Sequence, residues 1–157
     1  AYALLPAIAF SSLRDGPSGF AAILFLFAAV WATDIFAYFT GRAIGGPKLA
    51  PAISPGKTWS GAVGGTVFAV LAVVALAFVL PALALPAILV PAIALSVVSQ
   101  IGDLAESAFK RHFGVKDSGN FIPGHGGVMD RIDGLAVAAV ALYLIASISG
   151  AVPGLIQ

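Results

Sequence analysis

The sequence has no cysteine and few charged residues. Of its 157 residues, 10% are charged, whereas about 25% is usual in soluble domains. The absence of cysteine excludes disulfides and thiolate metal sites, and two histidines argue against a histidine-rich metal site. Any metal site should therefore be built from carboxylates, which favour hard ions such as Mg²⁺. The net charge of +1 is not informative about nucleic acid, because the charges are localised and their pattern matters more than their sum; no nucleic acid is expected as a partner.

Apolar residues make up 60% of the chain, and the mean hydropathy is +1.04. This composition predicts an integral membrane protein of the all-α class, a polytopic transmembrane helical bundle. Three spans are expected over residues 19–40, 61–80 and 128–150. A fourth begins at 86 and continues as one helix that protrudes into water as far as 113. We expect one membrane-embedded catalytic domain over residues 1–157, forming the C-terminal part of a longer chain.

The predicted span at 19–40 is preceded by a short apolar segment and a turn, and it contains one acidic residue. Residues 2–13 are apolar but too short for a full span, for which about 20 residues are needed. Residues 11–18 are expected to form a turn, because they combine two charges with glycine and proline. Asp34 lies near the end of the 19–40 segment, where a carboxylate is costly unless it faces a bundle interior or a wet cavity. It is either a site residue or an interfacial acid paired with Arg42 or Lys48.

Residues 41–60 are rich in glycine and proline and are expected to form a basic loop. Lys57 stands in the sequence PGKT, which matches a fragment of a phosphate-binding P-loop. The full P-loop pattern and its strand–helix context are missing, so we reject a Walker site. The loop binds either substrate phosphates or anionic lipid head groups. The following sequence, GAVGG, indicates either a close helix–helix contact or an adaptable helix end.

Residues 107–133 hold four of the eight basic residues, three of the seven acidic ones and both histidines. Asp130 and Asp133 are three residues apart, on one face of a helix, near its N-terminus. If this helix packs antiparallel to the one before it, Asp103 can join them in a three-carboxylate metal site. The alternative is an interfacial charge network with the neighbouring bases.

Basic residues and exposed amides in the same stretch are suited to phosphate. Lys110, Arg111 and Lys116 can bind phosphate oxygens or anchor the chain at the membrane surface. The PGHGG turn presents His125 beside backbone amides, whereas His112 has no such context and is treated as a surface residue. Seven of the eight basic residues lie in 41–60 and 102–131, on one predicted side, which should be cytoplasmic. Carboxylates, bases and a bilayer together indicate phosphoryl or nucleotidyl transfer onto a lipid.

At this point the sequence resembles the phosphatidate cytidylyltransferase (CDP-diacylglycerol synthase) family over residues 31–134. The signature of that family is matched by Ser107, Lys110, Arg111, Lys116, Asp117, Pro123, His125, Gly126, Gly127, Asp130, Arg131 and Asp133. Further matches are Asp34, Ala37, Tyr38, Gly41, residues 48–51 and 54–58, residues 102–104 and Glu106. The sequence departs from the family at Ser60, where relatives often carry Glu or Gln, and in lacking the family's additional N-terminal spans.

The resemblance implies transfer of CMP from CTP to phosphatidate, giving CDP-diacylglycerol and pyrophosphate. It implies Mg²⁺ as the cofactor and leaves open whether a second cation takes part. It implies a homodimer in the bacterial inner membrane, with the active site facing the cytoplasm. The implied metal ligands are Asp103, Asp130 and Asp133, which with Lys110 and Arg111 are the implied catalytic residues. The implied phosphate-binding residues are Lys57, Thr58, Lys116, His125, Gly126, Gly127 and Arg131. Asp34 and Asp117 are candidate additions.

Other functions were weighed against this one. A CTP-dependent polyprenol or lipid kinase would transfer the γ-phosphoryl group and release CDP. A membrane transporter with an acidic site would place its charges near the midplane of the bilayer, whereas the predicted charges gather at one face. A lipid-binding scaffold would need the bases but not the acids.

Overall fold

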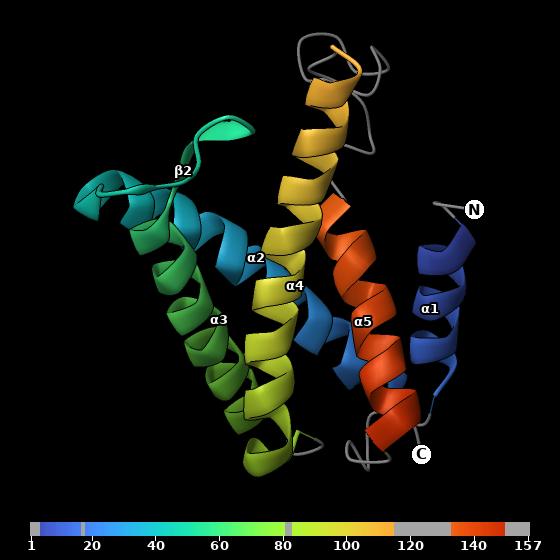
Figure 1. The fold of residues 1–157 in the computed structure, drawn as a ribbon. Helices are drawn as coiled ribbons and strands as arrows, with labels where there is room; N and C mark the ends of the chain where they lie inside the picture. Colours follow the sequence, from blue (N-terminus) through green and yellow to red (C-terminus); the bar gives the residue numbers. More distant parts are fainter. Residues whose placement is uncertain (1–3, 17, 81–82, 115–132, 150–157) are drawn as a thin grey trace, which may run out of the picture.

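A computed structural model describes residues 4–16, 18–80, 83–114 and 133–149 (Figure 1). In this part of the chain the fold is a helical bundle with one small hairpin, which confirms the all-α prediction. Its elements are α1 (Leu4–Asp15), α2 (Gly19–Ile44), β1 (Lys48–Ala50), β2 (Ser54–Thr58), α3 (Trp59–Val79), α4 (Leu85–His112) and α5 (Asp133–Ser149).

Among the described residues, three helices, α2, α3 and α4, are long and apolar enough to cross a membrane. α3 has large apolar side chains on its outer face that the bundle leaves exposed: Val63, Val67, Leu71 and Phe78. An apolar surface of this kind suits contact with lipid rather than water. At 17 residues, α5 is at the short end of the range that spans a bilayer. The chain is an integral membrane protein.

Two predicted boundaries were wrong. α1 continues through Arg14 and Asp15, which were expected to belong to a turn. Both side chains are exposed, and Arg14 Nε donates to Asp15 Oδ1 at 3.1 Å. Because neither charge is buried, the helix can include both residues. α2 continues four residues past position 40, to Ile44. It ends where Gly45 and Gly46 take positive φ angles of 68° and 101°, which few residues other than glycine adopt.

The predicted loop at 41–60 contains an antiparallel hairpin instead, in which Lys48 pairs with Thr58 and Ala50 with Ser54. The Ile53 amide donates to the Ala50 carbonyl at 3.1 Å, closing a turn that has Pro51 at its second position, where proline is favoured. Glycine and proline are depleted in strands, and for that reason the composition indicated a loop.

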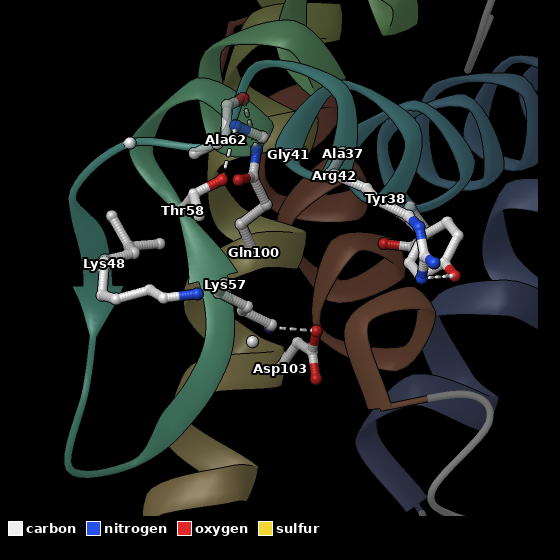
Figure 2. Close-up of a pocket in the computed structure, with 16 residues that line it drawn as sticks. Ala37, Tyr38, Gly41, Arg42, Lys48, Lys57, Thr58, Ala62, Gln100 and Asp103 are labelled. Atoms are coloured by element: carbon white, nitrogen blue, oxygen red, sulfur yellow. Dashed lines mark hydrogen bonds and ion pairs between the residues drawn. The ribbon is translucent and has the colours of Figure 1, made fainter.

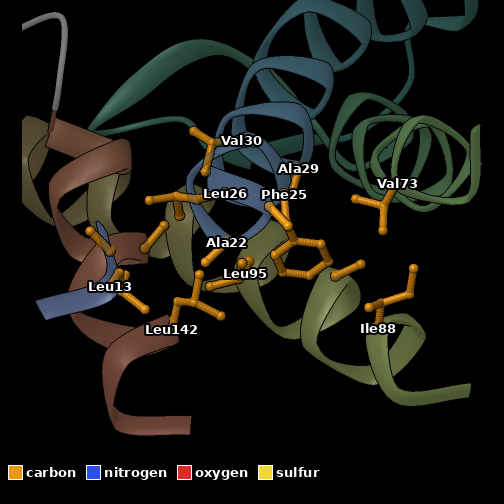
Figure 3. Packing of buried hydrophobic residues seen from close by; sticks show 14 of the residues in the cluster. Leu13, Ala22, Phe25, Leu26, Ala29, Val30, Val73, Ile88, Leu95 and Leu142 are labelled. Atoms are coloured by element: carbon orange, nitrogen blue, oxygen red, sulfur yellow. The ribbon is translucent and has the colours of Figure 1, made fainter. Parts of the chain in front are cut away.

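Helices α2 and α3 pack unusually closely. A Cβ atom on Gly61 would lie 2.7 Å from the Ala37 carbonyl oxygen, and one on Gly65 would lie 2.7 Å from the Thr33 carbonyl oxygen. Real Cβ atoms essentially never come within 3.0 Å of such an atom, so only glycine permits this approach. The close-contact interpretation of GAVGG is therefore confirmed. Deeper in the bundle, Phe25, Leu95 and Leu142 pack together from α2, α4 and α5 (Figure 3).

α4 is one continuous helix, as predicted, even though Pro91 lies inside it. α5 runs antiparallel beside it (Figure 1). The two helices touch where Gly102 meets the Val137 side chain and where Gly134 faces the Ser99 carbonyl oxygen. The packing that the predicted three-carboxylate cluster required is therefore present.

Candidate functional site

A cavity of about 660 Å³ lies where the C-terminal half of α2, the hairpin, the start of α3 and the polar half of α4 meet (Figure 2). Two acids and three bases line it: Asp34, Asp103, Arg42, Lys48 and Lys57. Several glycines contribute backbone to its wall. The cavity lies at the hairpin end of the bundle, and these five are all the acidic and basic residues that the sequence has between positions 20 and 105.

Lys57 and Asp103 form an ion pair across this cavity, with the Lys57 ammonium donating to Asp103 Oδ2 (Figure 2). Lys57 stands near the end of β2 and Asp103 stands on α4, so the pair joins the hairpin to the long helix. About a third of each side chain is exposed, 31% for Lys57 and 37% for Asp103. Both charges are therefore accessible to a ligand that enters the cavity.

Asp34 lies on the wall of the same cavity as Lys57 and Asp103. The alternative partners do not hold it in the described part of the chain. Arg42 instead donates to the Tyr38 hydroxyl at 3.3 Å, and Lys48 occupies the hairpin strand opposite Thr58.

Thr58 has a structural task as well as a place in the cavity wall. Its hydroxyl accepts a hydrogen bond from the Gly61 amide at 3.1 Å and so caps the N-terminus of α3. The Ser60 hydroxyl donates to the Gly45 carbonyl and lies 3.0 Å from the Thr58 hydroxyl. Gly41 leaves room for this cap, because a Cβ there would lie 2.8 Å from Thr58 Oγ1. These contacts fix the position of Lys57, and they give Ser60 a role that the sequence left open.

Sequence reasoning missed Gln100, which lines the cavity from α4. The signal was present, since Gln100 is an amide within a predicted spanning helix, and polar residues in spanning helices often mark functional positions.

Lys110 and Arg111 are not brought into this cavity. Lys110 forms an ion pair with Glu106 at 3.0 Å, one helical turn away on α4, and Arg111 is exposed near the end of that helix. Their predicted contact with phosphate stays a prediction.

Several predicted site residues lie outside the described residues: Lys116, Asp117, His125, Gly126, Gly127, Asp130 and Arg131. Asp133 is described only as the first residue of α5. Its neighbour Gly134 lies against Ser99, one turn before Asp103, so the backbone of Asp133 starts close to the cavity helix.

The donor set suits a hard cation in part. Asp34 and Asp103 supply carboxylate oxygens to one cavity, and such oxygens are the ligands that Mg²⁺ prefers. Among the described residues there is no group of three acids or histidines; the predicted ligand Asp130 lies outside them, and Asp133 is described only by its place in α5. The bases and exposed glycine backbone of the cavity can neutralise phosphate. Together these groups can bind a phosphate-bearing molecule with a divalent cation.

Comparison with known proteins gives one consistent result. The pattern of the Cytidylyltransferase family matches residues 1–149. A phosphatidate cytidylyltransferase of Brucella abortus is 58% identical over 148 residues, covering 94% of this chain and 55% of the relative. Those of Haemophilus influenzae and Bacillus subtilis are 48% and 46% identical, covering 80% and 81% of this chain and 45% and 48% of the relatives. The chain spans about half the length of the curated relatives it matches.

Proposed function

Because the chain belongs to the cytidylyltransferase family, we propose that it transfers CMP from CTP to phosphatidate, giving CDP-diacylglycerol and pyrophosphate. An ionised phosphate oxygen of phosphatidate attacks the α-phosphorus of CTP. The new P–O bond forms as the bond between the α-phosphorus and its bridging oxygen breaks, and pyrophosphate leaves. The nucleophile is already ionised, so no general base is required.

The observation that carries this proposal is the meeting of Lys57 and Asp103 in one open cavity at the polar end of spanning helices. A basic group can neutralise phosphate there, and an acid can bind a cation beside it. The cavity lies close to the lipid, because its walls include α2, α3 and α4, which are candidate spans. Nothing in the comparisons supports the kinase or transporter alternatives.

The proposal includes Mg²⁺ held by Asp103 with Asp130 and Asp133, and with Asp34 as a further oxygen donor. When bound, the ion would neutralise triphosphate oxygens and lower the cost of attack by an anion. We further propose that the protein is a homodimer in the bacterial inner membrane, with this cavity facing the cytoplasm. That orientation puts the bases of the cavity on the side where positive charge is normally retained.

The reaction is tested with the full-length protein in detergent, supplied with phosphatidate, Mg²⁺ and CTP labelled separately at the α and γ phosphates. We expect the α label in the lipid product and the γ label in pyrophosphate. Entry of the γ label into lipid would instead identify a kinase. If neither label reached lipid at any Mg²⁺ concentration, the proposal would be wrong.

Replacement of Lys57 by methionine should weaken substrate binding. The variant keeps the apolar stem but removes the ammonium that neutralises phosphate, and hydrogen bonds to charged groups correspond to about a ten- to hundredfold change in affinity. We expect KM for CTP or for phosphatidate to rise by that factor, with Lys57→Arg recovering part of it. Arg14→Met, which removes an exposed base at the end of α1 that does not line the cavity, is the control. Equal kinetics for Lys57→Met and Arg14→Met would contradict the assignment.

A further inference from the structure

The side-chain amide of Gln100 is held in one orientation. Its Nε2 donates to Thr66 Oγ1 and Ser96 Oγ, each at 3.3 Å, and lies 3.4 Å from the Ala62 carbonyl oxygen. A backbone carbonyl can only accept, so the atom facing Ala62 has to be the amide nitrogen. The opposite orientation of the amide would set two oxygens against each other.

The hydroxyl groups behind Gln100 are themselves fixed. Ser96 Oγ lies 3.0 Å from Thr66 Oγ1 and 2.8 Å from Thr33 Oγ1. Thr33 also bonds to the Ala29 carbonyl oxygen at 2.7 Å. Thr33 and Ser96 are completely buried. This hydroxyl cluster joins α2, α3 and α4 inside an otherwise apolar bundle, where an unpaired polar group is costly. Turning the Gln100 amide would remove its donation to Thr66 and Ser96 of this cluster.

With its nitrogen engaged, Gln100 is left with a free acceptor. Within the described residues, Gln100 Oε1 has no hydrogen-bond partner. It is not buried either, because in that part of the chain Glu106 Oε2 is the only buried side-chain oxygen or nitrogen that lacks a partner. Oε1 is therefore accessible, and the surface that Gln100 presents is the wall of the Lys57–Asp103 cavity (Figure 2). The cavity thus contains one neutral, oriented acceptor beside its charged groups.

A ligand that displaces water from this acceptor has to supply a donor in its place, since an unpaired buried acceptor is costly. Fully ionised phosphatidate has no N–H or O–H group, because both of its remaining glycerol oxygens are esterified. CTP has a 4-amino group on cytosine and two ribose hydroxyls. We propose that Gln100 Oε1 accepts a hydrogen bond from the nucleoside part of CTP, and that Gln100 is a specificity-determining residue for the nucleotide. This inference rests on the proposed function.

The test is equilibrium binding of nucleotides to the full-length protein in detergent with Mg²⁺ and without phosphatidate. The nucleotides are CTP, UTP, 2′-deoxy-CTP and 3′-deoxy-CTP, and the proteins are the wild type and the near-isosteric Gln100→Met. We expect the substitution to weaken CTP about five- to tenfold. The affinity for the one analogue that lacks the recognised donor should be unchanged by the substitution. If that analogue is UTP, Gln100 recognises the cytosine amine; if it is one of the deoxynucleotides, Gln100 recognises the hydroxyl that this nucleotide lacks.

Two further variants separate recognition from general damage. Ser99→Ala removes a buried hydroxyl that bonds only to the Ser96 carbonyl in the described structure, and it should keep the wild-type order of affinities. Thr66→Val removes one acceptor of the amide and should reduce discrimination while CTP still binds.

Equal weakening of all four nucleotides by Gln100→Met, or unchanged affinities, would overturn the inference. If the wild type transfers CMP and Gln100→Met discriminates among the four nucleotides as the wild type does, the inference on Gln100 fails and the proposed function stands. If the wild type binds no CTP, the proposed function fails with it.

Discussion

Replacement of Asp103 by asparagine is expected to lower the rate of CMP transfer by about 10²–10³-fold, with the protein still folded. The amide keeps the shape of the side chain but removes the charge that pairs with Lys57 and that would bind the cation. Losing one electrostatic contact to the developing charge of a transition state commonly costs this factor. The rate is measured with α-labelled CTP and phosphatidate at saturating Mg²⁺.

The matched control is Asp15→Asn, which also removes one carboxylate, but from an exposed position at the end of α1. It should leave the rate within about twofold of the wild type, because exposed ion pairs contribute little. Circular dichroism and gel filtration establish that both variants fold. An Asp103→Asn protein with near-normal turnover would remove Asp103 from the site.

The second large effect is on stability. Gly65→Leu should lower the apparent melting temperature in detergent by about 5–10 °C, because its side chain cannot fit between α2 and α3. A Cβ alone would lie 2.7 Å from the Thr33 carbonyl oxygen and 3.0 Å from the Ala37 Cβ. The helices would have to separate, and the hydroxyl cluster around Thr33 would be strained.

Gly56→Leu is the control for this substitution. Gly56 lies in β2, and a Cβ there meets nothing within 4 Å. Its melting temperature should stay within about 2 °C of the wild type. If Gly65→Leu melted at the same temperature as Gly56→Leu, the close α2–α3 contact would not contribute to stability.

Much of the fold could be predicted from the sequence, because long apolar runs have few alternatives to helix in a membrane. The continuity of α4 through Pro91 was predicted, and its polar end was placed in water. The hairpin was not predicted, since its strands are three and five residues long and rich in residues that strands disfavour. Such short pairing depends on tertiary contacts, here the cap at Thr58 and the Lys57–Asp103 pair.

The site could be predicted by residue type but not by arrangement. Lys57 and Asp103 were both selected as candidates, yet nothing in the sequence shows that residues 46 positions apart form an ion pair. The sequence left Asp34 between two interpretations, and its place on the cavity wall depends on helix packing that the sequence does not show. Gln100 was missed because a single amide carries little weight until its partners on other helices are known.

The length of α4 has one more consequence. Asp103 stands 18 residues after Leu85 in this helix, which is about 27 Å along its axis at 1.5 Å per residue. The hydrocarbon layer of a bilayer is about 30 Å thick. A helix that enters this layer at Leu85 therefore places Asp103 near the depth of the lipid phosphate groups. In the reaction that we propose, a lipid substrate would need only to diffuse sideways within its leaflet, and the water-soluble nucleotide would descend to meet it.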